Sequence, residues 1–164
     1  MPSSITLQPI TAEHHPLIER LWQLYRHDLS EYRYNYPGAD GLYPTERLRT
    51  FFTDADRCGY LVKQGDQVAG FVLVRGLVSG LRVMGEFFVL RAARRQQVGW
   101  QAALAVLRRH PGDWEIAFQE NNPGAARFWR RIAGELAVDG YKDEQRPVPG
   151  KPNIEPDTWL SFTV

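Results

Sequence analysis

The segment of the chain that decides the fold covers residues 82–100 and reads RVMGEFFVLRAARRQQVGW. Its first part, residues 82–90, is rich in apolar residues and predicts a strand. A helix is predicted over residues 97–110, because apolar residues recur there at helical spacing, and Pro111 and Gly112 end it. The apolar face of this helix consists of Val98, Ala102, Ala103, Val106 and Leu107.

The turn between this strand and this helix is suited to bind an anion. The first amide groups of a helix have no backbone partner and carry partial positive charge, so they can bind phosphate. Arg91, Arg94 and Arg95 add full positive charges, and no Asp or Glu occurs between Glu86 and Asp113. The alternative interpretation is an arginine-rich surface loop followed by an ordinary core helix.

The residues before this segment predict a strand, two helices and a β-hairpin. Thr11 is the expected N-cap of the first helix, and Pro44 lies in the first turn of the second. Gln64-Gly65-Asp66 is a typical hairpin turn. The predicted elements are a strand at residues 5–9, a helix that ends in the loop region 30–43, a helix at 44–52, and strands at 59–63 and 68–75.

The residues after the segment predict a further strand, a helix and two final strands. The predicted ranges are a strand at 114–118, a helix from 122 to about 133 before Gly134, and strands near 136–143 and 158–164. This order of elements indicates a mixed α/β fold built around one sheet. The 164 residues fit a single domain, residues 1–164.

The composition excludes several classes of protein. Hydrophobic residues make up 43% and charged residues 24% of the chain, which is typical of a soluble globular protein. The net charge of +1 argues against a dedicated nucleic-acid-binding protein. One cysteine, Cys58, allows no internal disulfide and no multi-cysteine zinc site. No apolar run is long enough for a membrane span and no secretory signal is recognisable, so we expect a cytoplasmic protein without a membrane or nucleic-acid partner.

Two motifs in the region 82–134 resemble the acetyl-CoA site of the GNAT superfamily of N-acetyltransferases. Arg94-Arg95-Gln96-Gln97-Val98-Gly99 is similar to that family's signature Arg/Gln-x-x-Gly-x-Gly/Ala between a strand and a helix. Asn122-Pro123-Gly124-Ala125-Ala126-Arg127-Phe128-Trp129 resembles the family's Asn-x-x-Ala-x-x-Phe-Tyr. The first eighty residues match the family only in the order of their elements.

The resemblance implies a GNAT-like fold, with a single central, mostly antiparallel sheet flanked by helices. It also implies transfer of an acetyl group from acetyl-CoA, as cosubstrate, to a primary amine of a small molecule or peptide by direct attack, without a metal. The backbone of Phe88, Val89 and Leu90 would pair with the pantetheine arm. The backbone amides of Arg95, Gln96, Gln97, Val98, Gly99 and Trp100 would cradle the pyrophosphate, and Arg94 would also bind the cofactor. Asn122 and Phe128 would line the cofactor from the second motif. A homodimer is possible.

The sequence departs from the family pattern at two positions. Gln97 replaces the first glycine of the signature, and its side chain could crowd the pyrophosphate or point outward. Trp129 replaces the tyrosine that often protonates the leaving thiolate, and an indole N–H cannot act as that acid. The alternative to an enzyme is therefore a non-catalytic acyl-CoA-binding regulatory domain.

Glu86 and Tyr141 are the two candidate acid–base residues. Glu86 is similar to the strand glutamate that family members use as a general base, and an amine that is protonated at pH 7 needs a proton acceptor. The alternative for Glu86 is a salt-bridged residue at the end of a strand. Tyr141 could reach the acceptor from a later strand, or be an ordinary half-buried aromatic residue.

The tyrosine-rich region 32–43 is expected to contribute to the acceptor site. Its tyrosines, together with Asp28, Glu31 and Asp40, could form an aromatic and acidic pocket for a cationic amine. The alternative is a lid that packs over the core. Cys58 has no flanking residue that would activate it, so a covalent acetyl-cysteine is not expected.

Overall fold

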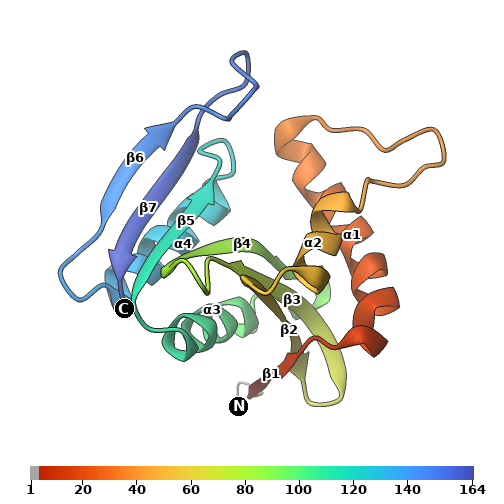
Figure 1. The fold of residues 1–164 in the computed structure, drawn as a ribbon, viewed down its shortest axis with the longest axis horizontal. Helices are drawn as coiled ribbons and strands as arrows, with labels where there is room; N and C mark the ends of the chain where they lie inside the picture. Colours follow the sequence, from red (N-terminus) through yellow and green to blue (C-terminus); the bar gives the residue numbers. More distant parts are fainter. Residues whose placement is uncertain (1–3) are drawn as a thin grey trace.

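The computed structural model describes residues 4–164 and contains one seven-stranded sheet with helices on both faces (Figure 1). The mixed α/β fold with a mostly antiparallel sheet, predicted from the sequence, is confirmed. In chain order the helices and strands are β1 (Ile5–Pro9), α1 (His15–Arg33), α2 (Glu46–Thr53), β2 (Arg57–Gln64), β3 (Gln67–Arg75), β4 (Leu81–Val89), α3 (Val98–Arg109), β5 (Asp113–Phe118), α4 (Pro123–Leu136), β6 (Lys142–Arg146) and β7 (Asp157–Thr163). Short 3₁₀ turns, Ala12–His14 and Arg91–Ala93, precede α1 and follow β4.

The strands follow the order β1-β2-β3-β4-β5-β7-β6. The β4–β5 pair is parallel, and the other pairs formed by residues 4–164 are antiparallel. A parallel pair needs a long crossover, and α3 supplies it. None of the described helices has the length and apolar composition needed to cross a membrane.

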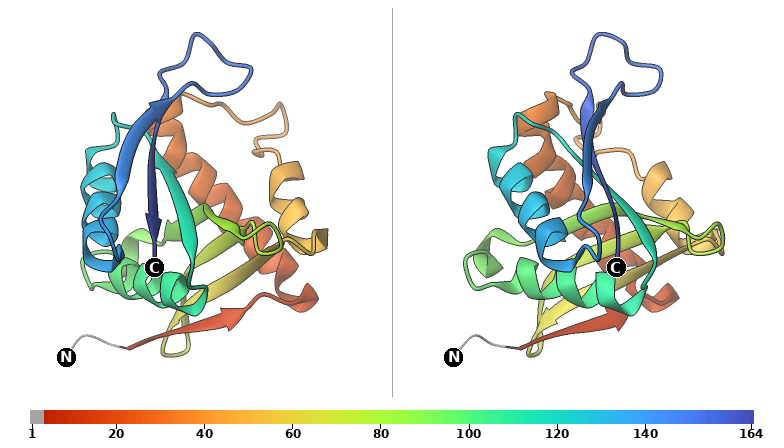
Figure 2. Two further views of the ribbon diagram at one scale, coloured as in Figure 1. Left: turned by 60° about the vertical axis from the view of Figure 1, so that its left-hand side comes forward. Right: turned by 90° about the vertical axis from the view of Figure 1, so that its left-hand side faces the viewer.

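The two faces of the sheet bury separate apolar cores. Helices α1 and α2 cover one face, where Trp22 and Leu48 pack with Phe71 and Phe88. Helices α3 and α4 cover the other face, where Leu107 and Ile132 are fully buried. Figure 2 shows that the two pairs of helices lie on opposite sides of the strands. The strand β4 lies between the two cores, and its side chains point into one core or the other.

A β-bulge at Gly85 changes the direction of the side chains along β4. Leu73 of β3 pairs with Glu86, and the next residue, Val74, pairs with Met84, so Gly85 is the extra residue. Because of this insertion, Met84 packs in the core under α3 and α4, whereas Glu86 contacts α1 and α2. Side chains two residues apart in a regular strand would share a face. A Cβ atom at position 85 would lie 2.8 Å from the Phe51 ring, which explains the glycine.

Strands β4 and β5 separate after a short paired stretch. Their register runs from Leu81↔Asp113 to Met84↔Ile116. Beyond this point β5 stays paired with β7, and β4 stays paired with β3. The second half of β4 therefore has a backbone edge that faces no strand, in the middle of the sheet.

The structure corrects several predicted boundaries. Helix α4 continues through Gly134 to Leu136 instead of ending at residue 133, because one glycine costs only about 1 kcal/mol in a helix. The strand predicted near residues 136–143 is wrong: β6 is Lys142–Arg146, an exposed edge strand without an apolar alternation. The predicted helix 44–52 begins instead at Glu46, after Thr45.

Candidate functional site

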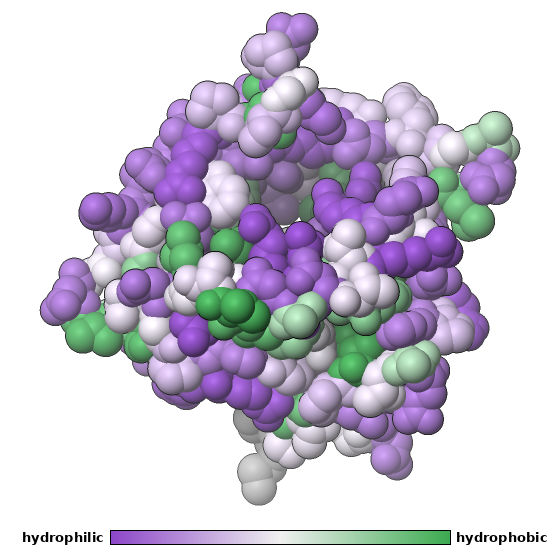
Figure 3. Space-filling view, in the orientation of Figure 1, coloured by the Kyte–Doolittle hydropathy of each residue, from purple (hydrophilic) through white to green (hydrophobic). Residues whose placement is uncertain are grey.

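A cleft of about 1320 Å³ opens where β4 and β5 separate. It is visible as the hollow above the centre of the space-filling view (Figure 3). Its walls come from α1, β4, the turn before α3, the end of β5, α4 and the loop before β7. The loops at residues 34–45 and 147–156 protrude from this end of the molecule (Figure 1).

The turn between β4 and α3 forms one end of the cleft. Arg95 and Gln97 both adopt left-handed backbone conformations, with φ of 66° and 62°. Gln97 is the N-cap residue of α3, so the free amide groups of the first helical turn follow it directly. Arg95 makes no ion pair with any residue of the described range 4–164. Partial and full positive charges therefore converge at this end, as an anion site requires.

Two other arginines of the turn are held by α1. Asp28 accepts from Arg91 Nη2 at 2.8 Å and from Arg94 Nη2 at 2.5 Å. Arg94 also donates from Nε to the carbonyl oxygen of Val89, at 3.0 Å. These contacts fix the turn against the helix, so Arg94 supports the shape of the turn while it lines the cleft.

Gly99 lies in the first turn of α3 and faces the cleft. A Cβ atom there would lie 3.5 Å from Val89 and 3.8 Å from Phe128, which is ordinary van der Waals distance. Its φ is not positive. Neither packing nor backbone conformation therefore demands a glycine. The space that the missing side chain leaves is open to a ligand, and an anion could approach the helix amides through it.

Gln97 stands in a conformation that favours glycine, and its replacement is expected to stabilise the protein. A left-handed backbone conformation destabilises the folded state by about 1–2 kcal/mol when the residue is not glycine. Glycine avoids this cost, but its greater flexibility in the unfolded chain destabilises the folded state by about 0.5–1 kcal/mol. We predict that Gln97→Gly raises the free energy of unfolding by about 0.5–1 kcal/mol. Urea denaturation measures this change. A lower unfolding midpoint in the variant would show that the Gln97 side chain makes compensating contacts.

The structure brings most of the predicted cofactor residues to the cleft. Those that line it are Phe88, Val89, Arg94, Arg95, Gln97, Val98, Gly99, Trp100, Asn122 and Phe128. Leu90 and Gln96 do not line it. The Leu90 amide donates to Ala69, and Gln96 is turned towards the β2–β3 hairpin, where Gln64 donates to its side chain at 3.0 Å. Asn122 caps α4, because its side-chain oxygen accepts from the Ala125 amide at 3.2 Å.

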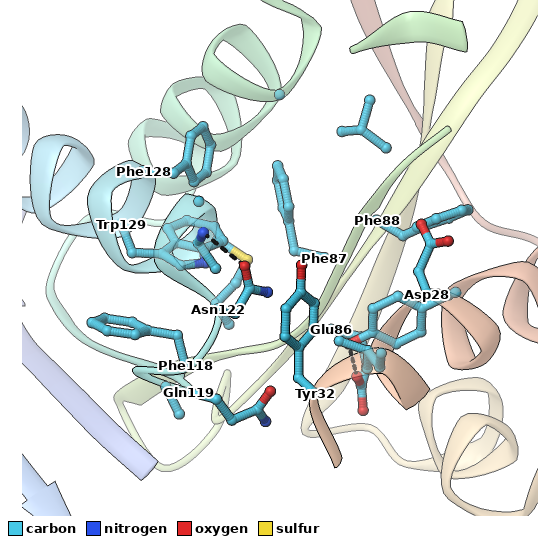
Figure 4. Close-up of a pocket in the computed structure, with 18 of the residues that line it drawn as sticks. Asp28, Tyr32, Glu86, Phe87, Phe88, Phe118, Gln119, Asn122, Phe128 and Trp129 are labelled. Carbon is cyan, nitrogen blue, oxygen red and sulfur yellow. Dashed lines mark hydrogen bonds between the residues drawn. The ribbon is translucent and has the colours of Figure 1, made fainter. Parts of the chain in front are cut away.

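Three aromatic rings form one wall of the cleft. Phe87 points from β4 towards Phe128 and Trp129 of α4 (Figure 4). The ring centroids of Phe87 and Trp129 lie 4.9 Å apart, and those of Phe128 and Trp129 lie 4.7 Å apart, both edge to face. Trp129 is buried, with 6% of its surface exposed. It therefore contributes apolar packing at the position where the sequence lacks the family's tyrosine.

Glu86 lies in the same cleft on the opposite side of β4. Its carboxylate accepts a hydrogen bond from the Tyr25 hydroxyl of α1 and pairs with Arg47 Nε of α2 at 2.7 Å. Its side chain is 6% exposed, whereas that of Arg47 is 54% exposed. The carboxylate is thus enclosed by protein, and its guanidinium partner is in contact with solvent.

Burial changes the acid–base properties of this group. Desolvation raises the pKa of Glu86 above the usual carboxyl value, and the Arg47 charge, the Tyr25 hydrogen bond and the Arg26 charge oppose this rise. The pKa of Tyr25 is raised well above its usual value, chiefly by burial and then by the Glu86 charge. Tyr25 therefore stays protonated and donates to Glu86. A carboxylate with a raised pKa is a better proton acceptor than an exposed one.

Tyr141 does not reach the cleft. It is 39% exposed, precedes β6 and lies outside the residues that line the site. Because α4 extends to Leu136 and the strand begins only at Lys142, the residue falls on the connecting loop. The structure therefore removes it from the acid–base candidates.

The acidic and aromatic pocket expected from region 32–43 is formed only in part. Asp28 is engaged by two arginines, and Asp40 is exposed and bonded to the Leu42 amide. Tyr34 and Tyr36 are 78% and 88% exposed. Tyr32 lines the cleft, and Glu31 lies at its exposed rim. The pattern of tyrosines in the sequence could not show which of them face outward.

Among the residues that the sequence analysis did not predict for the site are Tyr25, Arg26 and Arg47, which lie near Glu86. All three come from α1 and α2, far from the two motifs. Tyr25 belongs to the apolar face of α1. The helical periodicity of the sequence therefore predicts its burial but not the hydrogen bond from its hydroxyl to Glu86. Among residues 4–164, no group of three His, Cys, Asp or Glu side chains is arranged to hold a metal ion.

Comparisons with known proteins agree with this geometry. Residues 18–134 match the Acetyltransferase (GNAT) family. A crystal structure of an acetyltransferase from Thermus thermophilus has a TM-score of 0.69 at 16% identity, covering 98% of this chain and 97% of that chain. A GNAT family acetyltransferase from Elizabethkingia anophelis with acetyl-CoA bound also has a TM-score of 0.69, at 15% identity and 98% coverage of both chains.

A third solved structure is the spermidine N-acetyltransferase from Vibrio cholerae in complex with CoA and spermine. Its TM-score is 0.65 at 11% identity, covering 97% of this chain and 95% of that chain. A comparison with curated protein sequences gives no significant match. The family match spans most of the chain, and the architecture agrees with it from end to end. The chain belongs to the GNAT family of acetyltransferases.

Proposed function

We propose that the protein transfers the acetyl group of acetyl-CoA to a primary amine. The observation that carries this proposal is the arrangement along the free half of β4, which has an anion-binding turn at its end and the buried carboxylate of Glu86 on one side. Both lie in one cleft. Relatives of the same fold hold acetyl-CoA or CoA, which supports the choice of donor.

The residues of the cleft would divide the chemistry between them. When bound, acetyl-CoA supplies an activated thioester carbon. The turn and the first amides of α3 would bind its phosphates, and the apolar wall of Phe87, Phe128 and Trp129 would keep water from the thioester. Glu86 would accept, directly or through water, the proton that a protonated amine must lose. A free thiol has a pKa of about 8.5, so departure as a thiolate needs no dedicated acid from Trp129.

A covalent route through Cys58 receives no support. Cys58 does not line the cleft, and burial raises the pKa of its thiol. The His110 ring lies 4.0 Å from its sulfur, but burial lowers the pKa of that histidine, so no imidazolium stabilises a thiolate. Direct attack by the amine is therefore the proposed reaction.

The test combines binding and turnover. Acetyl-CoA at about 100 times its dissociation constant should stabilise the protein by roughly 2.7 kcal/mol, which corresponds to about 5–10 °C in melting temperature. Desulfo-CoA and inorganic phosphate serve as controls. Thiol release that requires an added amine would establish the transferase. No shift with any CoA species would refute the proposal.

The alternative is a non-catalytic acyl-CoA-binding domain, and Trp129 at the tyrosine position is the observation in its favour. Both readings expect the thermal shift. Binding without amine-dependent thiol release, over a panel of cationic, neutral and anionic amines, would decide for the binding domain.

A further inference from the structure

Arg26 is a half-buried side chain of the cleft that has no charged partner. It comes from α1 and lines the cleft beside Glu86 and Arg47. No residue of the described range 4–164 forms an ion pair or hydrogen bond with it. Its guanidinium carbon lies 5.7 Å from the ring centroid of Trp22 and 5.7 Å from that of Tyr43. The two rings position the cation without neutralising it.

The acidic residues that line the cleft around Glu86 and along α1 are largely engaged by other arginines. Glu86 pairs with Arg47 at 2.7 Å, and Asp157 pairs with Arg33. Lys151 adds a further positive charge to the lining of the cleft. The remaining acid, Glu31, is exposed at the rim. The lining of the cleft thus has a surplus of positive charge, although the whole chain is nearly neutral.

The surplus is costly in the free protein. Burial and the neighbouring Arg47 charge lower the pKa of Arg26, and the Glu86 carboxylate opposes this change without reversing it, as expected for a guanidinium that has lost hydration and faces a like charge. Contact with the aromatic faces of Trp22 and Tyr43 stabilises the cation in part but supplies no negative charge. A bound anion would neutralise the surplus, and a guanidinium is well suited to hold a carboxylate or phosphate through paired hydrogen bonds.

We propose that the acceptor is an amine that also carries a carboxylate or a phosphate, and that Arg26 binds this anionic group. The proposal rests on the proposed acetyl transfer and specifies its substrate class. The amine nitrogen would face Glu86 and the thioester, while the anionic group would lie between Arg26 and the rim. A polyamine such as the spermine held by the Vibrio cholerae relative would instead bring more positive charge to Arg26 and Arg47.

Matched pairs of amines test the substrate class. The probes are β-alanine against β-alaninamide and O-phosphoethanolamine against ethanolamine, with spermidine as the polycation. Thiol release gives kcat/KM for each. We expect at least one anionic amine to exceed its neutral partner and spermidine by roughly 10-fold or more. The two pairs distinguish a carboxylate from a phosphate.

Variants of Arg26 test the residue. Arg26→Gln should lower kcat/KM for the preferred anionic amine by about 10- to 100-fold, the range of one charge-assisted hydrogen-bonded pair, and for its neutral partner by less than about 3-fold. Arg26→Lys should recover part of the loss, because it keeps the charge but not the planar fork. Arg20→Gln, an exposed arginine of the same helix outside the cleft, is the matched control and should change neither value.

The outcomes separate this inference from the proposed function. Turnover that favours spermidine or the neutral amines overturns the anionic acceptor and leaves acetyl transfer intact. An unchanged anionic-to-neutral ratio in Arg26→Gln removes Arg26 from substrate binding. Acetyl-CoA binding without turnover of any amine refutes acetyl transfer, and the inference falls with it.

Discussion

Replacing Gly99 by glutamate is expected to abolish acetyl-CoA binding while the protein remains folded. The position lies in the first turn of α3, where an acidic side chain is compatible with the helix and its dipole. The neighbouring atoms of Val89 and Phe128 leave room for a Cβ atom. The new carboxylate would occupy the space offered to the pyrophosphate and repel it. No thermal shift should remain at acetyl-CoA concentrations that saturate the wild type.

The matched control for this variant is Gly134→Glu. Gly134 is an exposed residue of α4, a Cβ atom there meets nothing within 4 Å, and it lies outside the cleft. Its substitution makes the same chemical change and should leave the acetyl-CoA shift intact. Gly99→Ala should fold equally well and weaken binding less than the glutamate. A folded Gly99→Glu protein that binds acetyl-CoA normally would show that the phosphates lie elsewhere.

Replacing Glu86 by glutamine is expected to lower kcat by about 100-fold or more, the usual contribution of a general base. Glutamine keeps an oxygen that can accept the Tyr25 hydrogen bond, but it cannot accept a proton from the amine. Arg47 loses its partner, yet its side chain is 54% exposed and can be hydrated. Acetyl-CoA binding should stay unchanged, because the anion-binding turn does not involve Glu86.

The pH dependence identifies the role of Glu86 more specifically. Its pKa is raised, so in the wild type kcat should increase with pH as the carboxyl group loses its proton. Deprotonation of the amine adds a second increase that is common to all variants. Glu86→Gln should lack the first increase and keep the second. Glu19→Gln, which removes a carboxylate paired with Arg49 on the surface at 3.3 Å, should match the wild type. An unchanged rate in Glu86→Gln would remove the residue from catalysis.

The sequence was most informative where local rules and spacing act together. The strand, turn and helix of residues 82–110 combine an apolar strand, an arginine cluster and a helical apolar face, and each pattern is set by nearby residues. The position of Glu86 on the central strand followed from the same segment. Its burial between Tyr25 and Arg47 did not, because α1 and α2 reach it only through the tertiary fold.

The remaining errors occur where the tertiary structure, and not the local sequence, decides the outcome. The strand β6 has the sequence KDEQR and lies at an edge of the sheet, so it needs no apolar face and shows no alternation. Asp28 looked available to a cationic substrate, but two arginines some sixty residues later in the chain bind it. Arg26 has no feature in the sequence that marks it. Ion pairs between residues far apart in the chain depend on how the helices and strands pack. The pattern of residues along the sequence does not show which charges will pair.

The separation of β4 from β5 gives the sheet an edge in its interior. Edges of sheets are normally the places where other proteins add strands and aggregate. Here the edge is recessed between flanking helices and loops, so a neighbouring protein's strand, with its own sheet attached, cannot approach it. An extended ligand that enters the cleft can lie along it. The fold thereby keeps unpaired backbone groups available to a ligand and protects them from pairing with the sheet of another protein.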